Sequence, residues 1–385
     1  MSEQHAEREQ RVTPLELFFD LVFAFAFTQV TTVLSNDPTW GGLGHSLLIL
    51  AALWWGWAAY AWLTNTIDPG EGAVWGAMLI AMAAMFVAAL AVPEVFGRHG
   101  VVFGVAFLIV NVMYLTLYAL GARGDRDLLA AILRTAPSTL AGAALIIAAG
   151  FIHGGLRPIL WLAALGVGLF GPLLGGMSGW RVEPAHFVER HGLIVIIAIG
   201  ESLIAIGLGA RGTGIGTGVI VAAVLGFVVA TSFWLAYFDF FAIRGQQMLA
   251  DRSGVQRTAL ARDVYTYLHL PMVAGIVLFA FAMKTTLAHV DDELHTIPAL
   301  GLCGGPALYL FAYVALRLRV SRTLGRGRLV AAIACTLLLP VAVVVPGLVA
   351  LTLVAAVWVA LHAYEIIWWS EARARTRALR LPAAS

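Results

Sequence analysis

The sequence is poor in charge, in lysine and in cysteine. Charged residues make up 12% of the 385 residues and hydrophobic residues 61%, whereas a soluble domain carries roughly 25% charged residues. Most of the protein surface is therefore expected to face lipid. The two cysteines, Cys303 and Cys335, lie in apolar runs, which excludes a disulfide framework, and no Cys/His cluster has the spacing of a zinc site. We predict no metal and no cofactor.

The small net charge of +2 and the single lysine, Lys284, give no indication of nucleic-acid binding. The predicted partners are the lipid bilayer and an unknown small solute or ion, and a homo-oligomer is left open. No segment outside the apolar runs is long enough to form a catalytic domain. We therefore predict that the protein is not an enzyme.

A helix needs about 20 apolar residues to cross a bilayer. The apolar runs between glycine, proline and charged breakers predict an all-α integral membrane protein of about twelve transmembrane helices. They are expected near 17–34, 41–63, 73–93, 101–121, 128–150, 157–177, 187–209, 215–243, 265–288, 297–317, 328–346 and 347–369. The division between the last two assumes a tight turn at Pro346-Gly347.

The basic residues predict the orientation of these helices. With twelve spans and a cytoplasmic N-terminus, only Arg98, Arg157, Arg211 and Lys284 of the 24 basic residues fall outside, and the other 20 are cytoplasmic. Cytoplasmic loops of membrane proteins carry an excess of arginine and lysine. Both termini are therefore predicted to be cytoplasmic.

Short strings recur six spans apart, in the same order. "WAAY" (Trp57 to Tyr60) matches "WLAY" (Trp234 to Tyr237), and "YLTLYAL" in the fourth span resembles "YLFAYVAL" in the tenth. An even offset preserves orientation, so the pattern predicts two parallel six-helix repeats. They would cover residues 1–180 and 181–385, the second with a short basic cytoplasmic tail. The repeated Trp and Tyr positions are candidates for lining a pore or cavity.

Two carboxylates open the first span, in "PLELFFDLVFAFAFTQ". Glu16 and Asp20 are four residues apart, so they share one face of a helix with Thr28. Glu16 is interpreted as a helix-start residue at the membrane interface, as is Glu189 at the start of the seventh span. Asp20 lies one turn deeper, where it is either a buried, paired carboxylate or part of an ion pathway.

Glu201 lies near the middle of the seventh span, in "IIAIGESLIAIG". A carboxylate at that depth must be protonated, paired or hydrated. Glu201 is therefore either a neutral side chain bonded to a neighbouring helix or a group that handles protons or cations. Gln29 and Asp239 complete the set of candidate ion, proton or substrate residues, although a pair between Asp239 and the helix-end Arg244 is an alternative.

The strings "ELFFDLVFAFAFTQ" and "HFVERHGLIVIIAIGES" resemble the bacterial low temperature requirement A family, over Val12 to about Trp369. The resemblance implies a polytopic protein of the bacterial inner membrane with no established biochemical activity. A transporter or ion-translocating permease that uses buried carboxylates is the function we expect. A non-transporting membrane-adaptation protein or a membrane enzyme remains an alternative.

The opening helix is also similar to the F-S-D-x-x-F-x-x-A-x-T helix of a potassium-channel family. Phe18, Asp20, Phe23, Ala26 and Thr28 fall at matching positions, but the serine of that motif is Phe19 here. This likeness implies a cation channel in which Asp20 braces the bundle. The first and seventh spans would line its pore, with Phe23 or Phe27 facing it.

Overall fold

The computed structural model of the chain describes residues 12–67, 72–211 and 214–378. The N-terminal eleven residues and the end of the predicted basic tail, 379–385, lie outside this part of the chain. Within it the regular structure is helical, apart from one isolated β-bridge between Glu293 and Pro346. The predicted all-α membrane fold is confirmed.

The helices alternate with short connections along the chain. The α-helices are α1 (Pro14–Asn36), α2 (Trp40–Thr64), α3 (Gly72–Ala91), α4 (Gly100–Gly121), α5 (Arg126–Phe151), α6 (Leu156–Gly175), α7 (Pro184–Gly209), α8 (Thr217–Ala236), α9 (Ala242–Ala250), α10 (Gly254–Ala261), α11 (His269–Ala288), α12 (Thr296–Ala299), α13 (Gly305–Ser321), α14 (Arg326–Leu337), α15 (Leu339–Ala342) and α16 (Gly347–Ala378). A 3-10 turn, η1 (Val92–Glu94), follows α3, and three π-helical turns, η2 (Tyr237–Phe241), η3 (Arg262–Tyr267) and η4 (Leu300–Gly304), interrupt the second half.

Eleven helical segments of the described chain are long and apolar enough to cross a membrane. They correspond to eleven of the twelve predicted spans. The exception is the predicted span at 328–346, which divides into α14, twelve residues long, and the four-residue α15. Pro340 lies in the first turn of α15 and has no N–H to bond the carbonyl four residues back, so the helix breaks there. The predicted turn at Pro346 is present, because α16 begins at Gly347.

By their contacts the residues form two units. The first consists of the chain up to Phe23, Leu53–Ile194 and Gly245–Ala261, and the second of Ala24–Ala52, Val195–Arg244 and the chain from Arg262. The boundary divides α1, α2, α7 and α9, so each of these helices contributes to both units. The predicted division into sequence halves at residue 180 stays a prediction.

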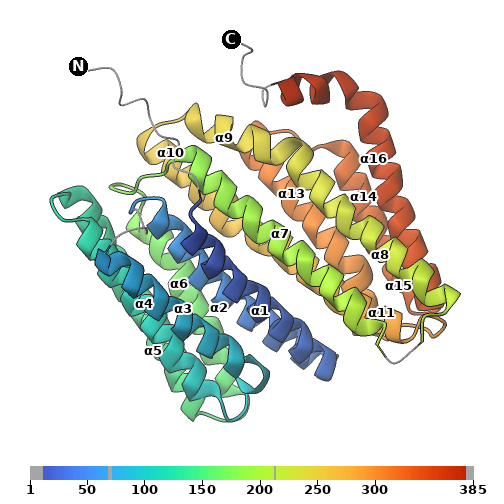
Figure 1. Ribbon diagram of the computed structural model, residues 1–385, viewed down its shortest axis with the longest axis horizontal. Helices are drawn as coiled ribbons and strands as arrows, with labels where there is room; N and C mark the ends of the chain where they lie inside the picture. The colour runs from blue at the N-terminus through green and yellow to red at the C-terminus, as the bar shows by residue number, and fades with distance from the viewer. Residues whose placement is uncertain (1–11, 68–71, 212–213, 379–385) are drawn as a thin grey trace. The chain divides into compact units, whose positions relative to one another are not determined.

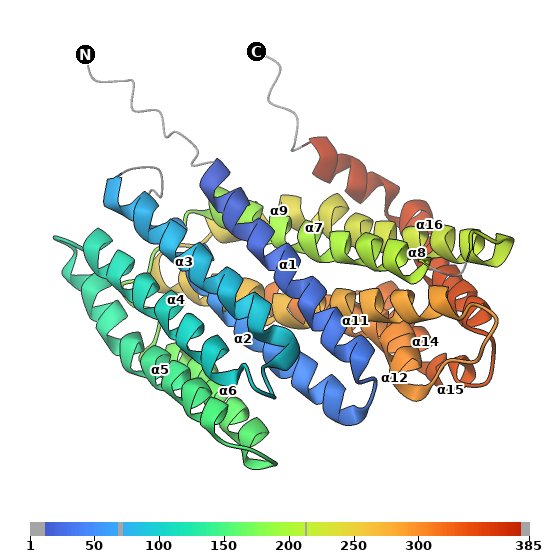
Figure 2. The ribbon, with the colours of Figure 1, turned by 60° about the horizontal axis from the view of Figure 1, so that its bottom comes forward.

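In the first unit, consecutive helices pack as antiparallel neighbours, α3 on α4, α4 on α5 and α5 on α6 (Figures 1 and 2). The crossing of α4 and α5 is close because it is built from glycine. A Cβ atom on Gly150 would lie 2.6 Å from the backbone nitrogen of Val101 and 2.7 Å from the carbonyl carbon of Gly100. Small residues at such crossings let two helix backbones approach in lipid.

Replacing Gly150 with leucine is expected to cost about 1–3 kcal/mol of unfolding free energy, the usual range for an overpacked site. The matched control is Gly166→Leu in α6, where an added Cβ meets nothing within 4 Å. Thermal unfolding in detergent micelles measures both variants. Equal melting temperatures for the two would show that the α4–α5 crossing tolerates a side chain.

In the second unit, five helices close a ring, in which α8 packs on α11, α11 on α13, α13 on α14, α14 on α16 and α16 on α8. Aromatic side chains fill its centre. The ring of Phe233 lies 5.5 Å from that of Phe279, 4.9 Å from that of Tyr309 and 5.1 Å from that of Trp358, between centroids. Such aromatic pairs stabilise a core beyond the apolar area they bury. The middle of this ring is therefore packed core.

Candidate functional site

The N-terminus of α1 is fixed by a capping box. Thr13 precedes Pro14 at the first helical position, and Glu16 accepts hydrogen bonds from the Thr13 backbone nitrogen at 2.8 Å and from its hydroxyl at 3.0 Å. The Glu16 backbone nitrogen donates in return to the Thr13 hydroxyl at 3.4 Å. Glu16 is thus a helix-start residue, but its side chain is completely buried instead of lying at an exposed interface.

Asp20 is held by an arginine and a tryptophan from two other helices. Its Oδ1 lies 2.9 Å from Nη2 of Arg190, and its Oδ2 accepts from Nη1 of the same guanidinium at 3.1 Å. The indole nitrogen of Trp57 in α2 donates to Oδ1 at 2.9 Å. Asp20 and Arg190 are both buried, so this is a two-pronged ion pair away from solvent. Of the two interpretations of Asp20, the paired carboxylate matches this geometry.

His186 and Arg190 are four residues apart on α7 and face Glu16 and Asp20, four residues apart on α1. The Nε2 atom of His186 lies 3.0 Å from Oε1 of Glu16, and Nε of Arg190 lies 3.7 Å from the same oxygen. All four side chains are at most 1% exposed. We call Glu16, Asp20, His186 and Arg190 the charge cluster. It belongs to the first unit.

The two basic members of this cluster, His186 and Arg190, were not predicted as site residues. Arg190 was counted among the basic residues that predict orientation, and His186, in the string "HFVERH", was not among the candidate site residues. A signal was present, because the four-residue spacing on α7 repeats that of the two carboxylates on α1. Only the pairing of the two helices shows that the two faces meet.

Glu201 occupies a second polar site, on the part of α7 that belongs to the second unit. Its side chain is 2% exposed. The hydroxyl of Thr28 donates to Oε2 at 2.5 Å, and the hydroxyl of Thr31 donates to Oε1 at 2.7 Å. Lys284 of α11 attracts the carboxylate from a greater distance, but no ion pair among the described residues includes Glu201. We call Glu201, Thr28 and Thr31 the threonine–carboxylate site.

Further buried hydroxyls lie in the same unit. Ser202, Ser46 and Thr286 are at most 2% exposed, and their hydroxyls have no hydrogen-bond partner among the described residues. Ser46 and Thr31 line a cavity of about 10 Å³, which is close to the room that one water molecule needs. Within the described residues, no group of three or more His, Cys, Asp and Glu is arranged to hold a metal ion.

The aromatic candidates have different surroundings. Phe23 and Phe27 are buried. Tyr60 is buried and donates to the carbonyl of Val110 at 2.9 Å, and the Tyr237 hydroxyl lies 2.9 Å from Nε2 of His269. Trp234 is 46% exposed, so it lies outside the core, and its assignment to the lining of a pore or cavity stays a prediction.

The remaining candidates have other surroundings. Gln29 is half-buried beside Thr28 in sequence, and Asp239 is half-buried in the π-helical turn η2. Glu189 is exposed and accepts a hydrogen bond from the Val12 backbone nitrogen at 3.2 Å. Their assignment as candidate site or interface residues stays a prediction.

A third buried charge lies in the second unit. The guanidinium of Arg328 bonds Glu365 at 2.7 and 3.3 Å, donates to the carbonyl of Ala236 at 3.2 Å and stacks over Tyr313, with its central carbon 3.7 Å from the ring centroid. These contacts tie α14 to α16, α8 and α13. This pair is local to the ring of helices and is interpreted as structural.

Comparison with known proteins returns one family model, described as bacterial low temperature requirement A protein (LtrA), which matches residues 11–363. The chain is also similar to the uncharacterized protein RA0937 of Rhizobium meliloti (strain 1021). The two are 33% identical over 311 residues, which cover 77% of this chain and 74% of that protein. No solved structure matches the chain.

Proposed function

The chain belongs to the bacterial low temperature requirement A family, and from its two buried polar sites we propose that it is a proton-linked transporter in which Glu201 binds and releases the proton. The arginine distribution supports an inner-membrane location with both termini cytoplasmic. The transported solute is proposed only as a small molecule or ion.

The hydrogen bonds around Glu201 support this proposal most strongly. Each threonine hydroxyl carries one hydrogen and has two acceptors in reach. For Thr28 they are Glu201 Oε2 at 2.5 Å and the carbonyl of Ala24 at 3.2 Å. For Thr31 they are Glu201 Oε1 at 2.7 Å and the carbonyl of Thr28 at 3.0 Å. A hydroxyl is both a donor and an acceptor.

Two arrangements of these hydrogens therefore satisfy the site. When Glu201 is charged, both hydroxyls donate to its oxygens. When Glu201 is protonated, its own hydrogen goes to one hydroxyl, which then donates to the carbonyl of its own helix. The site accommodates both states by hydroxyl rotation alone, so a proton can come and go without movement of a helix.

Among the described residues no cation is ion-paired with Glu201, and two hydroxyl donors alone bring its charged and neutral states close in free energy. A charged carboxylate inside the bilayer costs on the order of 3 kcal/mol on insertion scales, and hydrogen bonds to a charged group contribute about 1.5–3 kcal/mol each. Two hydroxyl donors thus offset a penalty of similar size. Asp20, in contrast, is neutralised by Arg190, and its role is proposed as holding α1, α2 and α7 together in the first unit.

Proton flux into proteoliposomes tests the proposal, with a pH-sensitive dye inside and an imposed proton gradient. Glu201→Gln keeps the shape of the side chain but removes the exchangeable proton, so flux is expected to fall at least tenfold. Glu189→Gln is the matched control, because it is the same change on an exposed residue of the same helix.

Equal flux in Glu201→Gln and in the parent would exclude Glu201 as the proton site. A potassium current that is independent of the proton gradient would favour a cation channel. No flux of protons or potassium in the folded parent would contradict the proposed proton linkage and leave a structural role in the membrane.

A further inference from the structure

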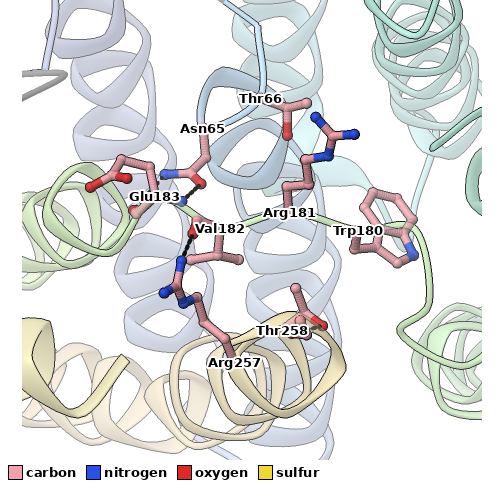
Figure 3. Close-up of a pocket in the computed structure, with 9 residues that line it drawn as sticks. Asn65, Thr66, Trp180, Arg181, Val182, Glu183, Arg257 and Thr258 are labelled. Carbon is pink, nitrogen blue, oxygen red and sulfur yellow. Dashed lines mark hydrogen bonds between the residues drawn. The ribbon is translucent and has the colours of Figure 1, made fainter. Parts of the chain in front are cut away.

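A pocket of about 390 Å³ opens in the first unit, beside the ends of several helices (Figure 3). Its walls are the residues after α2, Asn65 and Thr66, the segment Trp180 to Glu183 before α7, and α10. The Arg257 side chain of α10 donates to the carbonyl of Val182 at 3.4 Å and so attaches α10 to that segment. Asn65 is the lining residue that connects this pocket to the charge cluster.

The orientation of the Asn65 amide is fixed by the backbone of Glu183. Its Nδ2 donates to the Glu183 carbonyl at 3.0 Å, and its Oδ1 accepts from the Glu183 nitrogen at 2.6 Å (Figure 3). If the amide were flipped, its nitrogen would face the Glu183 nitrogen, donor against donor, and its oxygen would face the Glu183 carbonyl, acceptor against acceptor. The nitrogen is therefore the atom that faces Nδ1 of His186, at 3.1 Å.

This orientation determines the state of the His186 ring. Nδ1 faces an N–H donor, so it must be the acceptor, and the ring hydrogen must be on Nε2. Nε2–H then donates toward Glu16, whose oxygens lie 3.0 and 3.3 Å away. The resulting imidazole is neutral, with one nitrogen toward the pocket wall and the other toward the buried carboxylate.

A neutral His186 leaves the charge cluster one positive charge short. Glu16 and Asp20 are two acids, and Arg190 is a single base. All are buried, and an uncompensated buried charge is costly. These groups are the charged partners that face His186 from α1 and from its own helix. One additional proton would make the cluster neutral.

We propose that His186 transfers protons between the pocket and the charge cluster, with Asn65 as the gate. A proton from water in the pocket adds to Nδ1 when the Asn65 amide turns away. The Nε2 proton then moves to a Glu16 oxygen, which leaves a neutral acid and a neutral imidazole protonated on Nδ1. For net transfer Glu16 releases its proton, and a half-turn of the imidazole then carries the remaining ring hydrogen from the Asn65 side to the Glu16 side, after which the Asn65 amide can return. The use of this relay by transported protons rests on the proposed function. The protonation of His186 and Glu16 from the pocket does not depend on it.

Nitrogen-15 NMR of histidine-labelled protein in lipid nanodiscs tests the relay without transport. His186→Gln identifies the ring signal by its loss. We expect a neutral ring with its hydrogen on Nε2 at neutral pH, and a change to the doubly protonated ring in Asn65→Leu, which removes the opposing donor. A parent ring that is charged or carries its hydrogen on Nδ1 would overturn the proposal, and so would a ring that Asn65→Leu leaves unchanged.

Proton flux tests the pocket as the entry. Thr66→Cys places a thiol on the pocket wall, and Thr323→Cys is a matched control in an exposed connection between α13 and α14. The native cysteines are both buried. A negatively charged methanethiosulfonate is expected to reduce flux at least fivefold in Thr66→Cys only, and His186→Gln to reduce it at least tenfold. Unchanged flux in modified Thr66→Cys and in His186→Gln would overturn the entry route. No flux in the parent would contradict only the proposed function.

Discussion

Replacing Arg190 with methionine is expected to lower the free energy of unfolding by about 3–5 kcal/mol, the cost of removing one partner from a buried ion pair. The guanidinium lies 2.9 and 3.1 Å from the two oxygens of Asp20 and approaches Glu16 at 3.7 Å. Methionine would fill much of the space but leave two buried acids without a base. Unfolding in mixed lipid–detergent micelles, followed by circular dichroism, measures the loss.

Two further variants make this result specific. Arg98→Met changes an exposed arginine of the same unit and is expected to have little effect. The double variant Asp20→Asn with Arg190→Met should lose at least 0.5 kcal/mol less than the two single losses together, because contacting residues are coupled. Purely additive losses would show that the pair does not stabilise the fold in the way its geometry indicates.

Replacing both Thr28 and Thr31 with valine is expected to reduce proton flux at least a hundredfold. Valine has nearly the shape of threonine but no hydroxyl, so both donors to Glu201 are lost. Hydrogen bonds to a charged group contribute about 1.5–3 kcal/mol each, so the charged state of Glu201 would become rare. Glu201 would then hold its proton and not release it.

Thr32→Val is the matched control for this double variant. Thr32 lies on the same helix, and its hydroxyl donates to the carbonyl of Thr28 at 2.8 Å instead of to Glu201. Its flux is expected to stay near that of the parent. Equal losses in Thr32→Val and in the double variant would mean that hydroxyls on α1 act through the helix backbone and not through Glu201.

The membrane fold was largely predictable from the sequence, because an apolar run of about 20 residues has the length that a helix needs to cross a bilayer. The break at Pro340 was not, since the predicted span at 328–346 has the apolar composition of its neighbours. The helix breaks there because a single proline, Pro340, lacks the backbone N–H that would bond the carbonyl four residues back. The turn at Pro346 was predictable, because proline and glycine adjoin there.

The candidate sites were predictable one helix at a time. Asp20 and Glu201 were identifiable because carboxylates inside apolar runs are costly, and Thr28 because it shares a helix face with Asp20. Arg190 was assigned to a cytoplasmic segment because the positive-inside rule counts charges and does not describe their partners. Thr31 was missed because threonine is common in membrane helices, and only the pairing of α1 with α7 distinguishes it from Thr32.

Infrared difference spectroscopy of the protein in nanodiscs, between acidic and alkaline pH, tests the proton-binding role of Glu201 most directly. We predict that the parent shows a protonated carboxylic acid band that is lost at alkaline pH and replaced by a carboxylate band. The exposed acids of the chain give the same kind of change in every variant, so the contribution of Glu201 is the part that should be missing from Glu201→Gln and retained in Glu189→Gln. Identical difference spectra for the parent and Glu201→Gln would show that Glu201 does not exchange a proton, and would contradict the proposed mechanism.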